Sequence, residues 1–117
     1  LAWLSYADSD LRPCLTPLFA AEEMTTNEAA RAEIKAWGQA RLQDHLAYVD
    51  QQLQGKQWVL GDAFTVADPF LFVVTTFTKW VGLDTSGYHH LNGWRARVAA
   101  RPAVHRVLEA EDLLGDI

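Results

Sequence analysis

Four polar side chains near the start of the chain are of types that could bind a ligand. Ser5, Ser9 and Arg12 follow one another at i, i+4 and i+7, so a helix places them on one face, with Asp10 beside them. Hydroxyls, a carboxylate and a guanidinium can form hydrogen bonds, and the two charged groups can pair with opposite charges. By themselves, the same four residues also fit an ordinary solvated helix face.

Other chemically capable residues do not form a site by their spacing. Cys14 is the only cysteine, and it has no histidine near it in sequence, which favours a partly buried structural thiol over a nucleophile. His89 and His90 are adjacent, so on a helix they point about 100° apart and cannot chelate one metal ion as neighbours. We therefore expect no metal site and no catalytic residue in this chain.

The segment from Thr65 to Asp68 has the form of an N-terminal capping box. We expect Thr65 to accept a hydrogen bond from the N–H of residue 68, and the carboxylate of Asp68 to accept one from the N–H of residue 65. Phe64 and Pro69 occupy the two positions of a hydrophobic staple. Since no His, Ser or Lys is placed to partner Asp68, the motif is interpreted as structural.

Helices must position these residues, because strand signals are almost absent. Alternation with period two never persists, whereas apolar residues recur at steps of three and four. The pattern predicts an all-α bundle of about five helices, at about 1–21, 28–54, 66–81, 87–100 and 103–114.

The first segment is expected to be kinked, or broken near residue 12, because Pro13 and Pro17 each remove an internal hydrogen bond. Its apolar face is formed by Leu4, Leu11, Leu15 and Leu18.

The second and third segments have the strongest patterns. In the second, Thr26 or Asn27 can cap the start, and Gly55 is suited to the end. Its apolar residues are Ala30, Ile34, Trp37, Leu42, Leu46, Val49 and Leu53. The third is apolar nearly all round, which is typical of a helix at the centre of a bundle, and Gly82 ends it.

The composition limits the classes of partner. A net charge of −5 and a pI near 5.2 argue against binding to nucleic acid or to an anionic membrane. A local basic cluster is explained by favourable charge near a helix C-terminus; it comprises Arg95, Arg97, Arg101 and Arg106. One cysteine and no visible signal peptide favour the cytoplasm. The chain opens inside an apolar pattern without Met, so we expect it to be a piece of a longer protein.

The chain resembles a known family along essentially its whole length, residues 1–117. Phe64-Thr-Val-Ala-Asp-Pro-Phe-Leu-Phe72, after Trp58-Val-Leu-Gly-Asp62, resembles the capping-box region of the C-terminal domain of glutathione transferases. Arg95-Ala-Arg-Val-Ala-Ala-Arg-Pro-Ala-Val104 resembles the late helices of the bacterial, beta-like members, and Thr16-Pro-Leu-Phe19 fits their first long helix.

The resemblance implies a homodimeric transferase of which this chain is the helical part. In the family, a thioredoxin-like N-terminal domain supplies the catalytic Tyr, Ser or Cys and most contacts to glutathione. Nothing in these 117 residues resembles that domain, so we expect this fragment alone to be inactive. No cofactor is implied, because glutathione is a co-substrate.

The resemblance also gives the polar face a role. In beta-like members, the first long helix faces the partner subunit and places polar side chains near the glutathione bound there. The matching positions are Ser5, Ser9, Asp10 and Arg12. Two positions depart from the family pattern, since Pro13 stands where a basic residue is usual and Ser5 where Asn is common.

A hydrophobic pocket for the second substrate is expected between the first long helix and the central one. Its candidate lining residues are Leu15, Phe19, Phe77 and Trp80, although each could equally be a core residue. Phe77 is the best single candidate, because its position often carries a large aromatic residue in the family.

Two functions from different classes follow. The first is conjugation of glutathione to small hydrophobic electrophiles, as in cytoplasmic detoxification. The alternative is a non-catalytic module of the same fold that serves in protein–protein assembly. Pro13 favours the alternative, and the intact polar face at Ser5, Ser9 and Arg12 disfavours it.

Overall fold

A computed structural model describes residues 2–117, so Leu1, the first position of the expected first helix, lies outside the described residues. Within this range every helix or strand element is a helix, and no strand is present; Trp58 and Gly61 form an isolated antiparallel bridge. In chain order, the elements are α1 (Trp3–Tyr6), the π-helical turn η1 (Ala7–Leu11), the 3-10 turn η2 (Arg12–Cys14), α2 (Thr16–Met24), α3 (Glu28–Leu53), α4 (Ala67–Trp80), α5 (His89–Ala99), α6 (Pro102–Ala110) and the 3-10 turn η3 (Leu114–Asp116).

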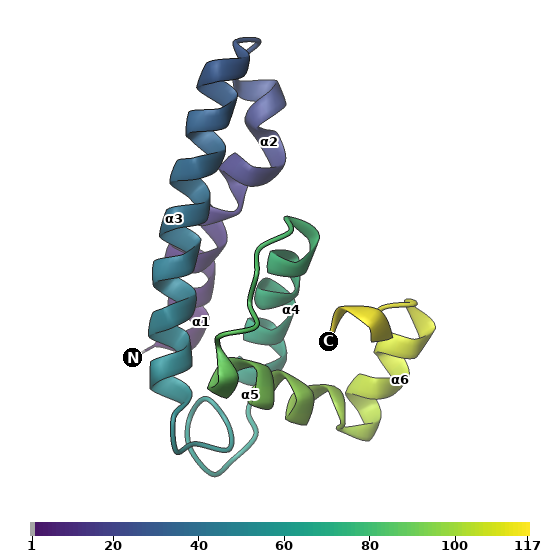
Figure 1. Ribbon diagram of the computed structural model, residues 1–117. Helices are drawn as coiled ribbons and strands as arrows, with labels where there is room; N and C mark the ends of the chain where they lie inside the picture. Colours follow the sequence, from purple (N-terminus) through teal and green to yellow (C-terminus); the bar gives the residue numbers. More distant parts are fainter. Residues whose placement is uncertain (1) are drawn as a thin grey trace.

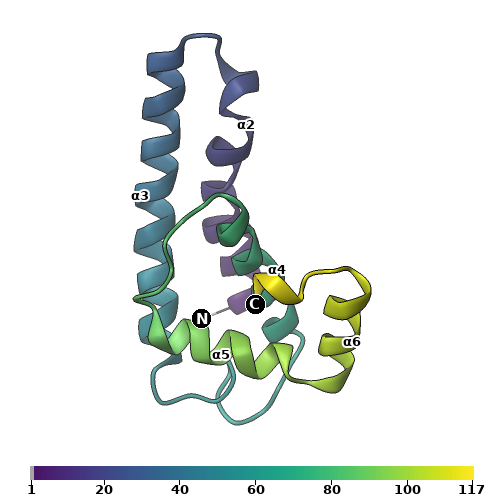
Figure 2. The same cartoon turned by 45° about the vertical axis from the view of Figure 1, so that its right-hand side comes forward.

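The all-α prediction is confirmed, and each of the five expected segments corresponds to part of this series. Figure 1 shows α2 and α3 as a hairpin, with α4 beside its lower half and α5 across its base. Turning the molecule shows that α6 and η3 lie on the far side of α4 from α3 (Figure 2). Within the described part, no helix is both long and apolar enough to cross a membrane.

The first segment is broken where the prolines predicted it. Helix α1 passes into the π-helical turn η1, then into the 3-10 turn η2, before α2 begins. A π-helical turn holds one more residue than an α-helical turn, so the residues before it are rotated by about 100° relative to an uninterrupted α-helix. For this reason Trp3 and Tyr6 face the core, and Leu4, which α-helical spacing places there, is 44% exposed. The prediction for Leu4 was wrong; Leu11 and Leu15 are buried as expected.

Helix α3 has the bounds that the sequence predicted. Asn27 caps its start by accepting a hydrogen bond from the backbone N–H of Ala30 at 3.1 Å, and the chain leaves it at Gly55 with φ of +75°. The predicted stripe is buried in its second half, comprising Leu42, Leu46, Val49 and Leu53.

In the first half of α3, the residue facing α2 is a glycine and not the expected tryptophan. Trp37 is exposed and lies against the guanidinium of Arg41, whereas Gly38 is buried. A Cβ atom built on Gly38 would lie 3.2 Å from the backbone O of Cys14 and 3.2 Å from the Cβ of Pro17. The missing side chain therefore permits the close approach of the two helices.

The start of α4 is organised around a buried carboxylate. Asp68 is fully buried, and its Oδ2 accepts a hydrogen bond from the backbone N–H of Thr65 at 3.0 Å, as in a capping box. The hydroxyl of Thr65 accepts from the N–H of Ala67 at 3.3 Å and not from residue 68, so that detail of the prediction was wrong. The other oxygen, Oδ1, accepts from the backbone N–H of Val59 and from the indole of Trp94. Asp68 thus joins the preceding loop, α4 and α5.

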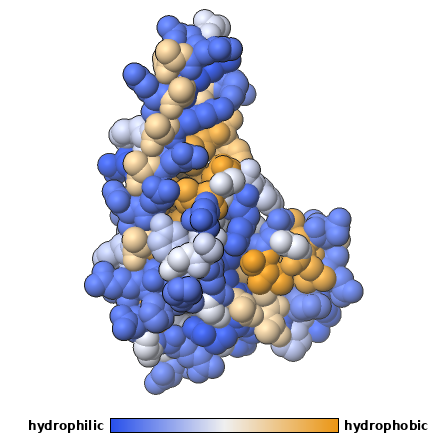
Figure 3. Space-filling model, viewed as in Figure 1, coloured by the Kyte–Doolittle hydropathy of each residue, from blue (hydrophilic) through white to orange (hydrophobic). Residues whose placement is uncertain are grey.

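Helix α4 is central, but one of its faces is not covered by any described element. Val73 and Trp80 are about half exposed, and Val66, just before the helix, is more so. The expected central position of α4 therefore holds for the rest of the helix but not for this face. Figure 3 shows hydrophobic surface beside α2 and at α6.

Candidate functional site

A hollow of about 410 Å³ opens between η2–α2 and the C-terminal end of α4. It contains all four of the residues expected in a hydrophobic pocket, and Arg12 from the expected polar face. Its full lining is Arg12, Leu15, Thr16, Phe19, Ala20, Phe77 and Trp80.

Three aromatic rings form the wall of this hollow. Phe19 from α2 meets Phe77 from α4 edge to face, with 6.4 Å between the ring centres, and Phe77 lies 5.2 Å from Trp80 on the same helix. Phe19 and Trp80 are about half exposed, and Phe77 is partly buried between them. Leu15 is buried beneath the hollow, so it belongs both to the core and to the lining.

Two lining residues, Thr16 and Ala20, were missed by the sequence analysis. Their signal is the spacing, because residues 12, 15, 16, 19 and 20 form one continuous face of a helical segment. Thr16 and Ala20 are a hydroxyl-bearing and a small residue, whereas the predicted pocket residues were all large and apolar.

The polar residues expected beside the hollow are all exposed on the described surface. Arg12 donates to Oδ1 of Asp8 at 3.1 Å in an exposed ion pair, so Asp8 is a further residue that the sequence analysis missed. Its signal was the i, i+4 spacing of opposite charges. The π-helical turn lies between Ser5 and Arg12, so the simple i, i+4, i+7 alignment expected for Ser5, Ser9 and Arg12 does not apply. Arg12 is the member of this set that lines the hollow.

Cys14 lies under this surface and not on it. It is buried, and its Sγ donates to the backbone O of Asp10 at 3.2 Å. Burial raises the pKa of the Cys14 thiol, which outweighs the opposing effect of Arg41. A thiol with a raised pKa stays protonated at neutral pH and is a poor nucleophile.

Behind α1, the hydroxyl of Tyr6 lies 2.8 Å from Nδ1 of His45 on α3. Burial, reinforced by the charges of Tyr48 and Asp10, raises the pKa of Tyr6 to about 12. The contact between Tyr6 and His45 ties α1 to α3. Because its pKa is raised, Tyr6 remains a neutral phenol at physiological pH.

A second hollow, of about 330 Å³, lies between α4 and α6 and is almost entirely apolar. Phe77 and Trp80 line both hollows, so they form the partition between them. Within residues 2–117, no three His, Cys, Asp or Glu side chains gather where they could hold a metal ion.

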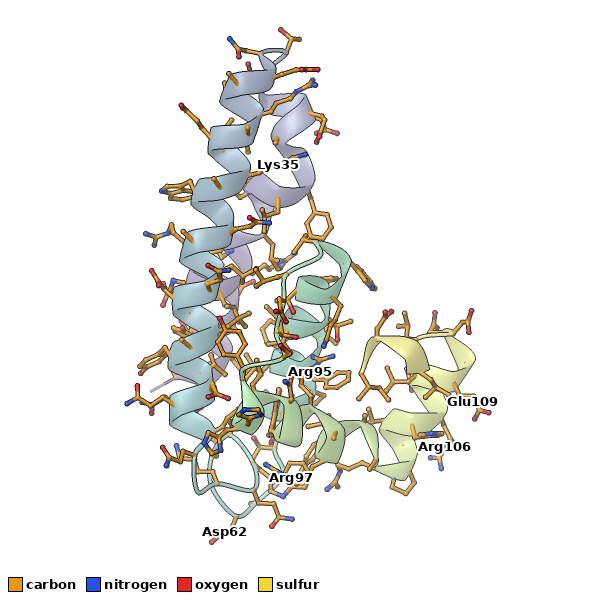
Figure 4. The ribbon with its side chains drawn as sticks, in the orientation of Figure 1. Lys35, Asp62, Arg95, Arg97, Arg106 and Glu109 are labelled. Carbon is orange, nitrogen blue, oxygen red and sulfur yellow. The ribbon has the colours of Figure 1, made fainter. Side chains whose placement is uncertain are left out.

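The basic cluster of the late helices is not one feature. Arg97 and Arg101 are near the loop that precedes α4, where Arg97 donates to the backbone O of Gln57 and Arg101 lies over the ring of Phe64. Arg95 is buried and points to α4, so the explanation by charge at a helix end was wrong for this residue. Figure 4 shows Arg95 between α4 and the C-terminal turn.

Comparisons with known proteins agree with this architecture. The family model for the glutathione S-transferase C-terminal domain matches residues 4–111. The chain is 35% identical over 113 residues to glutathione S-transferase GstA of Escherichia coli O157:H7, covering 97% of this chain and 53% of that protein.

Two solved structures share both sequence and fold. The first is a sphingomonad glutathione S-transferase complexed with glutathione, with 34% identity and a TM-score of 0.80, covering 96% of this chain and 52% of that one. The second is a bacterial beta class glutathione S-transferase from Sphingomonas chungbukensis, with 32% identity and a TM-score of 0.81, covering 97% and 53%. The chain spans about half the length of the relatives it matches.

Proposed function

Because the chain belongs to the glutathione S-transferase C-terminal domain family, we propose that it is the helical half of an enzyme that conjugates glutathione to small hydrophobic electrophiles. The thioredoxin-like half of such an enzyme would precede it and would supply the residue that activates the thiol. In the reaction, the glutathione sulfur attacks an electrophilic carbon, a C–S bond forms, and a leaving group departs with its electron pair.

The observation that carries the proposal is the composition of the hollow between α2 and α4. Phe19, Phe77 and Trp80 offer apolar surface that an electrophile could cover, and Arg12 places a cation at the same hollow. An apolar cavity with one convergent polar group is typical of small-molecule sites. Arg12 is suited to the carboxylates of glutathione, because a guanidinium forms strong, directed bonds to carboxylates.

The role proposed for this domain is positioning. The hollow would hold the electrophile near the sulfur and exclude water, which lowers the entropic part of the barrier without proton transfer by this domain. The polar residues Ser5, Ser9, Asp10 and Arg12 would contact glutathione across a homodimer, and the enzyme would act in the cytoplasm. Arg12 would then exchange its partner Asp8 for a carboxylate of glutathione, which costs little because the ion pair is exposed.

The test is steady-state conjugation of glutathione to a chlorodinitrobenzene by the full-length protein that contains this chain. Phe77→Ala should raise KM for the electrophile about fivefold or more, because it removes a large aromatic contact. Arg12→Ala should instead raise KM for glutathione about twofold to fivefold, the worth of an exposed ion pair.

Lys35→Ala is the matched control, because Lys35 is an exposed cation on α3 that pairs with Glu22 and does not line the hollow. It should leave both KM values unchanged. If the full-length protein neither binds glutathione nor conjugates it, the transferase proposal fails.

A further inference from the structure

The C-terminal turn η3 is bonded to the wall of the hollow. The indole Nε1 of Trp80 donates to Oδ2 of Asp116 at 3.1 Å. The backbone O of the same residue accepts a hydrogen bond from Arg95 at 3.0 Å. Asp116 therefore bridges an exposed aromatic side chain at the end of α4 and a buried cation on α5.

Arg95 gives this bridge a rigid base. It is 2% exposed, and its guanidinium donates to the backbone O of Phe72 at 2.9 Å and to the hydroxyls of Thr75 and Thr76. The guanidinium also lies 4.2 Å from the ring centre of Phe72. Burial lowers the pKa of Arg95 to about 10, against the charge of Asp116, so the side chain is still cationic at neutral pH.

Such an arginine is strongly fixed in place. A buried cation is stable only where hydrogen-bond acceptors surround it, and a guanidinium makes its bonds in a rigid plane. With Phe72, Thr75 and Thr76 all on α4, Arg95 locks α5 to that helix. Its remaining bond extends this lock to Asp116 in η3.

Trp80 is the part of the hollow that most needs to be held. It is half exposed, and it lines both hollows with Phe77. Ring contact with Phe77 restrains one side of the indole. The hydrogen bond from Nε1 to Asp116 restrains its polar edge. Without that bond, a half-exposed side chain at a helix end could move between rotamers, and the partition between the two hollows would move with it.

We propose that Asp116, held by Arg95, is a positioning residue that fixes the indole of Trp80 and so sets the shape of the apolar pocket. The proposal rests on the function proposed above for that pocket. If the indole is already fixed, binding of an apolar compound costs no side-chain entropy at Trp80. If the indole is mobile, binding must order it, and that costs free energy. Asp116 thus affects how tightly apolar compounds bind and leaves the chemical step alone.

The first test follows the indole itself in the full-length protein. The Nε1–H resonance of Trp80 is recorded by ¹H–¹⁵N NMR and assigned by its loss in Trp80→Phe. Asp116→Ala should move this resonance and accelerate its hydrogen exchange, because the acceptor is gone. Asp116→Asn should restore it, since an amide oxygen can still accept the bond.

Glu109→Ala is the control, because Glu109 is an exposed carboxylate on the nearby helix α6 whose side chain makes no hydrogen bond in the described structure (Figure 4). It should leave the resonance unchanged. An unmoved resonance in Asp116→Ala, or an Asn variant that behaves like the Ala variant, would overturn the proposal.

The second test measures binding of Nile red, an uncharged apolar fluorescent probe, to the same variants. Asp116→Ala should bind it about threefold to tenfold more weakly, the usual cost of ordering one side chain on binding. In a Trp80→Phe background the same substitution should have no effect, because the bond is already absent. An equal loss in both backgrounds would show that Asp116 acts by another route and would overturn the proposal.

These readouts separate the two proposals. Neither the resonance nor probe binding requires glutathione or catalysis. Absence of conjugating activity would refute the proposed function. The effect of Asp116→Ala on the Trp80 resonance would still test the role proposed for Asp116.

Discussion

The indole N–H of Trp94 donates a 2.8 Å hydrogen bond to Oδ1 of Asp68, and both residues are completely buried. This contact joins the start of α4 to the middle of α5. The same carboxylate also accepts hydrogen bonds from the backbone N–H groups of Val59 and Thr65. One side chain therefore holds together the loop before α4, the start of α4 and α5.

Replacing that carboxylate should be strongly destabilising. Asp68→Ala leaves three donors without an acceptor, each costing about 1–3 kcal/mol, so we expect the free energy of unfolding to fall by at least about 3 kcal/mol. Asp68→Asn keeps one acceptor oxygen and should lose about 1–3 kcal/mol. Urea denaturation measures both values. Asp62→Ala, at an exposed carboxylate in the preceding loop, should change stability by less than about 0.5 kcal/mol. Similar losses in Asp62→Ala and Asp68→Ala would contradict this account.

Two glycines in helices should respond oppositely to the same substitution. Gly38→Ala puts a methyl group 3.2 Å from a backbone oxygen and from the ring of Pro17, and neither can move without shifting α2. Overpacking costs about 1–3 kcal/mol and the better helix propensity of alanine offsets about 1 kcal/mol, so we expect a net loss of up to about 2 kcal/mol.

Gly93 on α5 is the matched position. A Cβ there meets only the end of the flexible Arg97 side chain, at an ordinary 3.5 Å. Gly93→Ala should therefore stabilise the protein by about 0.5–1 kcal/mol. Thermal and urea midpoints of the two variants should shift in opposite directions; a shared direction would show that helix packing at Gly38 is looser than described.

Asp50 on α3 caps another helix from a distance. Its Oδ1 accepts the backbone N–H of Leu91 in the first turn of α5 at 2.8 Å. Asp50→Ala should cost about 1–2 kcal/mol, the usual worth of an N-terminal cap. Asp50→Asn retains the acceptor but loses the favourable charge at the helix start, so its loss should be smaller. Asp44→Ala, at an exposed position on the same helix, serves as the control in urea denaturation. A larger effect at residue 44 than at residue 50 would rule out the cap.

Tyr6 should make stability depend on pH in the alkaline range. Its pKa is raised from 10.0 to about 12, first by burial, so the folded protein holds the phenolic proton more tightly than the unfolded chain. Stability from this source is complete below pH 10 and is lost as the pH rises toward about 12. The fall in the free energy of unfolding over this range should be smaller in Tyr6→Phe, measured by urea denaturation at several pH values. An identical alkaline fall in both proteins would assign it to other groups.

Features governed by neighbouring residues were predictable from the sequence. Asn27 and Gly55 bound α3 as predicted, because caps and helix ends depend on local backbone geometry. The four pocket candidates, which the family resemblance suggested, line one hollow. The proline break was predicted for the same local reason.

Features governed by distant contacts were not predictable. The sequence places Arg95 in a basic cluster, yet its partners Phe72, Thr76 and Asp116 lie about 20 residues away on either side. The π-helical turn, which turns Trp3 toward the core, has no recognisable pattern of apolar residues in the sequence. For this reason Leu4 was predicted to face the core, although it is exposed. The exposure of Trp37 likewise follows from how closely α2 approaches Gly38, which only packing determines.

The projecting hairpin of α2 and α3 has a consequence for how the molecule opens. The lower part of α3 is packed against η1 and α5, whereas its tip meets only α2 (Figure 1), in part through exposed polar contacts such as that of Lys35 with Glu22. Native-state opening is easiest where few apolar groups are buried. Amide protons near the tip should therefore exchange with solvent through small local fluctuations. Those near Leu46 and Val49 should exchange only when the whole domain unfolds. One unbroken helix would thus contain two different kinetic classes of hydrogen bond.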